Sequence, residues 1–188
     1  MKFVRYVVVV ALGCALAGCA PGGTSSPPVS GVPTSTPTPT STPTPEWSAE
    51  EQAAIDAVQR YLEVWTSIGQ DLVASDWNKI RDVASDPAAN NALDLWVSWA
   101  QHDWHLVGSP TFTPDYVTPG ATDYLGDRYH VHGCYSLEGS YLADPTGKSA
   151  GDPRRLRTSG SFLVLHLTPP TGPAYYLVIE ETVEENPC

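Results

Sequence analysis

Apolar side chains between residues 48 and 69 recur at the spacing of a helix. We expect this helix to begin at Ser48, which together with Glu51 has the pattern of a capping box, and to stop near Gly69. Six apolar positions fall on one of its faces: Ala54, Val58, Tyr61, Leu62, Trp65 and Ile68. A stripe of this kind predicts burial against another element.

Two further helices are predicted before the pattern changes. A short one is expected near 77–84, with Trp77 and Ile80 on one side. Asp86 and Pro87 have the residue types of the N-cap and first position of another helix. The apolar positions of this third helix again have helical spacing: Leu93, Trp96, Val97, Ala100 and Trp104.

After residue 104 the pattern becomes that of strands separated by turns. We predict four strands, near 104–116, 128–138, 156–168 and 174–184. Pro110 and Pro114 favour an edge or bulged position for the first strand. The segments 162–165 and 175–179 are apolar on both faces, which predicts cover on both faces. Residues 139–152 are interpreted as a polar hairpin connection with a turn at 144–147.

Helices followed by antiparallel strands predict an α+β domain in which the N-terminal helices pack on one face of the sheet. The segment 47–188 is long enough for one such domain with one core. Residues 1–18 have the pattern of a secretory signal, because Lys2 and Arg5 precede an apolar stretch too short to span about 30 Å of hydrocarbon. Residues 19–46 comprise Cys19 and a Pro-, Thr- and Ser-rich linker, which cannot bury enough apolar area to fold.

The segment Leu16-Ala17-Gly18-Cys19 resembles the lipobox of bacterial lipoproteins. The resemblance implies that the Cys19 thiol receives a diacylglycerol, that a peptidase cuts before Cys19, and that the domain is held on the outer face of the cell membrane. Two acyl chains give the stable anchoring that one chain does not. The alternative is an ordinary signal peptide with an unmodified Cys19.

Charge narrows the choice of partners. The chain has 10 Lys and Arg against 21 Asp and Glu, a formal net charge of −11. An anionic domain is poorly suited to nucleic acid, whose binding depends largely on phosphate neutralisation, so we expect no nucleic-acid partner. The simplest role of this charge is to keep the domain soluble.

The order of helices and strands resembles that of the nuclear transport factor two-like superfamily, cone-shaped domains that include polyketide cyclases and ketosteroid isomerase. Within it, the segment 129–135 (Tyr-His-Val-His-Gly-Cys-Tyr) and the final Pro187-Cys188 resemble small secreted actinobacterial and phage-borne lipoproteins. These resemblances imply helices packed on a curved four-stranded sheet and a disulfide between Cys134 and Cys188. The oxidising environment outside the membrane favours the same bond, and two free thiols are the alternative.

No catalytic pattern of the superfamily can be carried over to this chain. The candidate polar groups for a pocket between sheet and helices are Asp103, His105, Tyr61 and Tyr129, of which Asp103 and His105 are candidate general bases. Two histidine pairs, His102 with His105 and His130 with His132, are the candidate zinc ligands. Partly exposed histidines are the simpler interpretation, so we expect no metal and no cofactor.

Two charged clusters are interpreted as solvated surface. Arg154, Arg155 and Arg157 would lie at the end of a hairpin. The acidic pairs Glu180-Glu181 and Glu184-Glu185 would lie along a solvated sheet edge.

Two functions are open at this point. The first is a non-catalytic surface lipoprotein whose domain binds a protein partner or a small apolar ligand at the cell envelope. A phage-derived role in blocking the entry of competing phage is one form of this function, and the sequence does not decide the origin. The second is a small-molecule isomerase or cyclase that uses a pocket Asp or His. An open pocket with such a group at its floor favours the enzyme, and a pocket filled by Trp and Leu favours the binding module.

Overall fold

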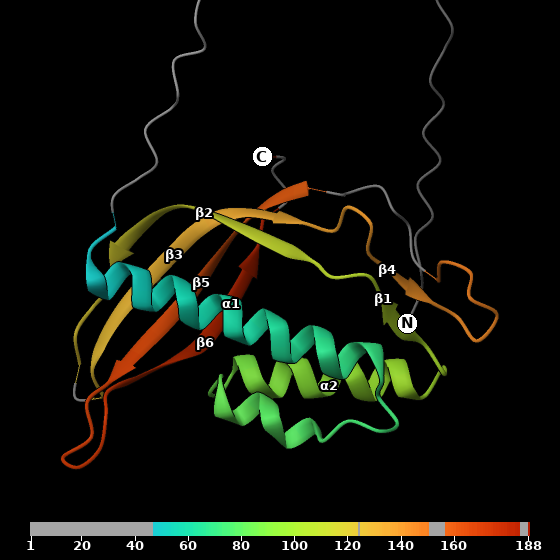
Figure 1. The fold of residues 1–188 in the computed structure, drawn as a ribbon, viewed down its shortest axis with the longest axis horizontal. Coiled ribbons are helices and arrows are strands. Elements are labelled where there is room, and N and C mark those ends of the chain that lie inside the picture. Colours follow the sequence, from blue (N-terminus) through green and yellow to red (C-terminus); the bar gives the residue numbers. More distant parts are fainter. Residues whose placement is uncertain (1–46, 124, 151–156, 185–187) are drawn as a thin grey trace, which may run out of the picture. The chain divides into compact units, whose positions relative to one another are not determined.

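The computed structural model describes residues 47–123, 125–150, 157–184 and 188. The predicted signal peptide, the lipobox with Cys19, the linker, and Arg154 and Arg155 lie outside these ranges. Within the described ranges, three helical segments precede six strands (Figure 1).

Helix α1 (Ala49–Gln70) begins where the capping box predicts. The Ser48 hydroxyl accepts a hydrogen bond from the Glu51 N–H at 3.2 Å, and the Glu51 carboxylate accepts one from the Ser48 N–H at 2.8 Å. Two N–H groups at the helix start are therefore satisfied reciprocally. The helix ends one residue beyond Gly69, so the predicted boundaries are confirmed to within a residue.

The next two helical segments are the 3₁₀ helix η1 (Trp77–Asp82) and α2 (Ala88–Ala100). The predicted start of α2 was wrong by a position, because Pro87 is the N-cap and the Asp86 carboxylate forms an ion pair with Arg81 at 3.3 Å. The predicted extension to Trp104 was also wrong. The chain turns after Ala100 through Asp103, which has a positive φ of 54°.

Six strands follow: β1 (His105–Val107), β2 (Thr111–Pro119), β3 (Asp127–Ser136), β4 (Tyr141–Ala143), β5 (Arg157–Leu167) and β6 (Tyr175–Val183). Four of them form one antiparallel sheet in the order β2-β3-β5-β6. The remaining two, β1 and β4, pair with each other as a separate antiparallel ribbon.

The ribbon β1–β4 departs from the sequence prediction, which had one strand over 104–116 and a polar connection over 139–152. The predicted strand is split at Gly108, which has a φ of +80°. A Cβ at this position would lie 2.2 Å from the Gly139 carbonyl oxygen, so only glycine permits the close approach of the two segments. The predicted turn is confirmed, since the Gly147 N–H donates to the Asp144 carbonyl at 2.9 Å.

Two β-bulges interrupt the four-stranded sheet. One lies in β2 between Pro114 and Tyr116, and β2 is an edge strand, which confirms the edge or bulged position that the prolines predict. The other inserts Ile179 into β6 between the partners of Leu163 and Val164. A bulge bends its strand and increases the local twist, and the long strands curve as they pass over α1 (Figure 1).

The helices cover one face of the four-stranded sheet, and the main core lies between the two layers (Figure 1). Its fully buried large side chains include Tyr61, Trp96 and Phe162. The predicted α+β class, with helices on an antiparallel sheet, is confirmed. The prediction that the segments 162–165 and 175–179 are covered on both faces is confirmed only in part, because Leu165 is buried but Tyr175 is exposed. None of the helices in the described ranges is long and apolar enough to cross a membrane.

Candidate ligand-binding pocket

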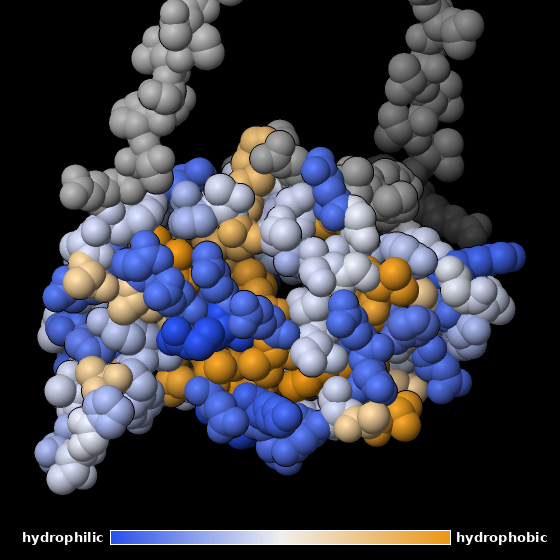
Figure 2. Space-filling model, viewed as in Figure 1, coloured by the Kyte–Doolittle hydropathy of each residue, from blue (hydrophilic) through white to orange (hydrophobic). Residues whose placement is uncertain are grey.

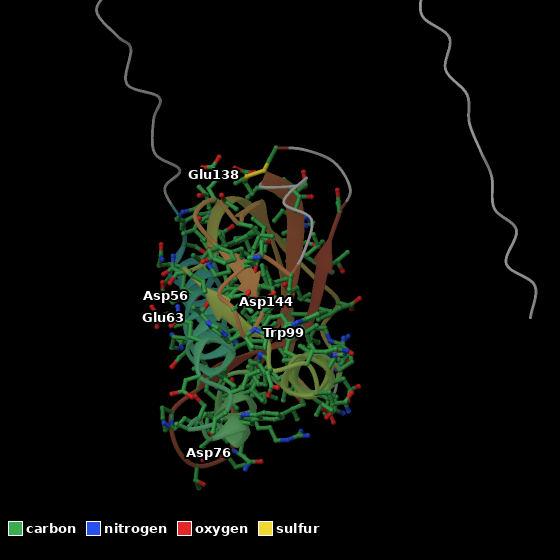
Figure 3. All side chains as sticks on the ribbon, turned by 90° about the vertical axis from the view of Figure 1, so that its right-hand side faces the viewer. Asp56, Glu63, Asp76, Trp99, Glu138 and Asp144 are labelled. Carbon is green, nitrogen blue, oxygen red and sulfur yellow. A yellow bond between two sulfur atoms is a disulfide. The ribbon has the colours of Figure 1, made fainter. Side chains whose placement is uncertain are left out.

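A pocket with a volume of about 460 Å³ opens between the helices, the ribbon β1–β4 and one end of the four-stranded sheet. Its size lies within the usual range for small-molecule sites. Figure 3 views the end of the domain that carries β1 and β4 and labels Trp99, a residue of the pocket wall. The lining is mostly aromatic and aliphatic: Trp65, Leu95, Trp99, Leu106, Tyr135, Leu137, Tyr141, Leu142 and Val183, with Ser140, Thr158 and Glu184.

Aromatic rings form much of the wall. Trp65 of α1 and Trp99 of α2 meet edge to face, with ring centroids 5.5 Å apart and planes at 81°. Tyr135 of β3 is buried, whereas Tyr141 of β4 lies at the mouth and is exposed. The wall therefore combines rings from four separate elements, which fixes its shape through the packing of the fold.

The mouth of the pocket is apolar as well. Leu95, Tyr141 and Val183 are all exposed, although they are large hydrophobic residues. Single exposed apolar residues are ordinary, but a group of three around an apolar pocket is typical of a binding surface.

Polar atoms in the pocket are few. Ser140 is only 8% exposed, and its hydroxyl has no hydrogen-bond partner among the described residues. The Thr158 hydroxyl donates to the Glu184 carbonyl. A small number of placed polar groups in an apolar pocket is what fixes the orientation of a ligand.

Glu181 of β6 lies on the inner face of the sheet, so the prediction of a solvated edge was wrong for this residue. Glu181 pairs across the strands with the buried Phe162, and Val178 pairs with the buried Val164. If Ile179 were a regular paired position of the strand, the alternation from Val178 would place Glu180 inside and Glu181 outside. The bulge moves Glu181 to the inner face, and no feature of the sequence indicates a bulge there.

Tyr61 and Tyr135 surround this carboxyl group. The buried Tyr61 hydroxyl donates a hydrogen bond to Glu181 Oε2 at 3.0 Å. Burial raises the pKa of Glu181, and the bond from Tyr61 opposes that rise. Burial and the neighbouring Glu181 charge raise the pKa of both tyrosines. The arrangement holds one acid beneath the pocket wall, next to the Tyr135 side chain that lines it.

The candidate general bases lie elsewhere. Asp103 and His105 line a different depression beside Gln70 and Trp104, where Asp103 is exposed and His105 is half-buried. Tyr129 lies near Tyr176, with ring centroids 6.2 Å apart, and neither lines the pocket. Of the four predicted pocket groups, only Tyr61 lies near this site, through Glu181. The described lining contains no Asp and no His.

The histidine pairs do not come together as a metal site. In the part of the chain that the structure describes, no three His, Cys, Asp or Glu side chains are close enough to hold a metal ion. His102 stacks on Trp104, with ring centroids 4.7 Å apart, at the end of α2. His132 stacks on Tyr116 at 4.4 Å on the outer sheet face, beside His130.

Cys134 and Cys188 are paired in the structure, as the resemblance implies. Their Cα atoms are 5.7 Å apart, within the range a disulfide requires. The bond is drawn in yellow in Figure 3. It attaches the chain end to β3, on the strand that also carries Tyr135 of the pocket.

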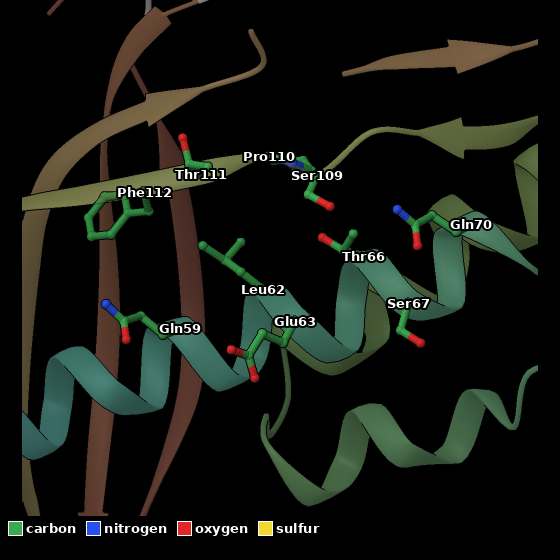
Figure 4. A pocket seen from close by; sticks show the side chains of 10 residues that line it. All are labelled: Gln59, Leu62, Glu63, Thr66, Ser67, Gln70, Ser109, Pro110, Thr111 and Phe112. Carbon is green, nitrogen blue, oxygen red and sulfur yellow. The ribbon is translucent and has the colours of Figure 1, made fainter. Parts of the chain in front are cut away.

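A second hollow of about 430 Å³ lies between α1 and β2, and Figure 4 shows its lining. Its walls carry Gln59, Glu63, Thr66 and Gln70, and its apolar contacts are Leu62 and Phe112. On the face in Figure 2, polar side chains cover most of the surface and an apolar band is exposed beside α1. The groove is more polar than the pocket near Trp99, so it is the weaker candidate for an apolar ligand.

The sequence indicated part of the pocket. Trp65 belongs to the predicted apolar stripe of the first helix, but Trp99 was missed because the stripe of the third helix was placed on Val97 and Ala100. Ser140, Tyr141 and Leu142 were missed because they fall in the predicted connection. The only signal there was the apolar run Tyr141-Leu142-Ala143 within a polar segment.

Comparison with known proteins does not assign this chain to a family. No protein-family model matches the sequence. No curated protein matches it either. The crystal structure of the intermembrane-space region of the chloroplast protein ARC6 is similar over 74% of this chain and 98% of that one, with a TM-score of 0.47 and 14% sequence identity. A likeness at this level carries no argument about function.

Proposed function

We propose that this chain is a lipoprotein anchored through Cys19 on the outer face of a bacterial cell membrane, and that its nuclear transport factor two-like domain binds a small apolar ligand without catalysis. The observation that carries the proposal is the apolar pocket of about 460 Å³, walled by Trp65, Trp99 and Leu142. The lipobox Leu16-Ala17-Gly18-Cys19 supports the anchoring.

The superfamily assignment is supported by the order of elements. Helices come first, they cover one face of a four-stranded antiparallel sheet, and the pocket opens between the two layers. A cone of this kind holds its ligand between sheet and helices.

A binding module is favoured over an isomerase by the position of the acids and bases. A general base must reach the proton that it removes. Asp103 and His105 lie outside the pocket, and Glu181 is not among the residues that line it. The one acid in the described lining, Glu184, is an exposed residue just beyond the end of β6. The described lining consists largely of Trp, Tyr and Leu side chains, which suits retention of an apolar molecule.

Fluorescence of the uncharged probe N-phenyl-1-naphthylamine tests this proposal. The protein is the mature chain with Cys19→Ala, which avoids acylation. We expect saturable binding at one site, weakened about fivefold or more by Leu95→Glu, because a charge then lies at the apolar mouth. Val97→Glu is the matched control, since both residues are exposed on α2, at 39% and 44%, and Val97 does not line the pocket. Equal effects of the two variants, or no saturable binding, would contradict the proposal.

A further inference from the structure

Four of the residues that line the pocket are aromatic: Trp65, Trp99, Tyr135 and Tyr141. The indoles of Trp65 and Trp99 stand at 81° to each other, so they form two walls that meet nearly at a right angle. The face of an aromatic ring carries partial negative charge and attracts a cation within about 6 Å of the ring centre. Several rings around one space are the usual means of holding an organic ammonium group.

The charged groups around the pocket also favour a cation over an anion. Among the described lining residues there is no Lys, Arg or His, so none of them places a positive charge in this space. Glu181 lies beneath the wall, close enough to Tyr135 for its charge to act on that hydroxyl. The whole chain carries a net charge of −11. Bringing an anion into this space would therefore cost electrostatic energy, whereas a cation would gain it.

The Ser140 hydroxyl adds a hydrogen-bond acceptor. It is buried at 8% exposure and has no partner among the described residues. Buried polar groups in folded proteins are nearly always hydrogen-bonded. Ser140 lines the pocket, so rotation of its side chain would offer the unpartnered hydroxyl to a ligand group. A protonated amine has only donors and would pair with the lone pairs of this oxygen.

From these observations we propose that the ligand is an organic cation, in which an ammonium group is carried on an apolar body. The aromatic walls face the ammonium group, and Leu106, Leu142 and the exposed Leu95 contact the apolar body. This inference rests on the proposed ligand-binding function and adds the charge of the ligand to it.

Four compounds that each contain an unbranched chain of eight carbons test the inference by isothermal titration calorimetry at pH 7. They are octyltrimethylammonium, octylamine, 1-octanol and octanoate, each titrated into the mature Cys19→Ala chain. We expect both cations to bind roughly 3- to 30-fold more tightly than octanol, which is the range of a cation–π contribution. Octanoate should bind more weakly than octanol.

Tyr141→Leu tests the role of the aromatic wall, because it removes a ring and keeps an apolar side chain. We expect it to weaken octyltrimethylammonium binding roughly threefold or more and to leave octanol binding within about twofold. Tyr175→Leu is the matched control, since both tyrosines are exposed on strands, at 39% and 46%, and Tyr175 does not line the pocket. Circular dichroism of each variant verifies that the fold is kept.

The outcomes separate this inference from the function on which it rests. Octanol or octanoate binding as tightly as the cations would overturn the charge preference while leaving an apolar pocket that binds ligands. Equal weakening of octanol and octyltrimethylammonium by Tyr141→Leu would also overturn it. Failure of all four compounds to bind would remove the proposed function together with the inference.

Discussion

Replacing Tyr61 with phenylalanine tests whether Glu181 is held inside the domain by a hydrogen bond. Tyr61 is buried, its hydroxyl donates to Glu181 Oε2 at 3.0 Å, and its ring packs against Phe162 with centroids 6.1 Å apart. Phenylalanine keeps the ring contact and removes only the hydroxyl. The change therefore isolates the hydrogen bond.

The expected loss follows from the kind of bond that is removed. A hydrogen bond to a charged group contributes about 1.5–3 kcal/mol, and the carboxylate left without its donor remains on the inner face of the sheet. We expect Tyr61→Phe to lower the free energy of unfolding by about 2 kcal/mol. Against a total stability of about 5–15 kcal/mol, this loss is readily measured.

Urea unfolding of the mature Cys19→Ala chain at pH 7, followed by circular dichroism, gives the free energy of unfolding. Tyr116→Phe is the control, since Tyr116 is exposed and stacks on His132, and its change should stay within about 0.5 kcal/mol. Glu181→Gln and the double variant complete a thermodynamic cycle, in which we expect a coupling energy of about 1 kcal/mol or more. Equal losses for Tyr61→Phe and Tyr116→Phe, or additive effects in the cycle, would refute the reasoning.

Three further predictions concern other parts of the chain. The folded-state pKa of Glu181 is raised, so its contribution to stability is present below the ordinary carboxyl pKa of 4.5 and is lost as pH rises through the raised value. The free energy of unfolding should therefore vary less with pH in Glu181→Gln than in the mature Cys19→Ala chain. Cys188→Ser in the mature Cys19→Ala chain opens a link across a sequence separation of 54 and should lower the free energy of unfolding by about 4 kcal/mol. The mature Cys19→Ala chain itself should show no thiol that iodoacetamide modifies without a reductant. Cys19→Ala in the precursor should abolish labelling by palmitate analogues and release the protein from the membrane; continued labelling would remove the anchoring proposal.

The helical half of the fold could be predicted because its signals are local. The capping box of Ser48 and Glu51 marks the start of α1, and the apolar stripe from Ala54 to Ile68 marks its buried face. The strands of the four-stranded sheet were also placed approximately, since turn residues and alternation are properties of short segments. Pro110 and Pro114 indicated the edge strand for a steric reason, the missing N–H of proline.

The parts that were missed depend on contacts between distant segments. The ribbon β1–β4 brings Gly108 against Gly139, a contact between distant segments, and each segment alone has a weak pattern. The inward position of Glu181 depends on one extra residue in β6, which is defined by its pairing with β5. Since the pocket is built from the ribbon and the end of β6, its position was predicted less well than the fold.

Nuclear magnetic resonance of the tryptophan indole N–H groups tests the central claim, that the pocket near Trp65 and Trp99 binds the ligand. Titrating octyltrimethylammonium into the mature Cys19→Ala chain should shift the Trp65 and Trp99 indole signals together and saturably. The indole of Trp77, which donates to the Leu72 carbonyl at 2.8 Å, and that of Trp104 lie outside the pocket and should not move. Shifts confined to Trp77 and Trp104, or unchanged Trp65 and Trp99 signals at saturation, would contradict the claim.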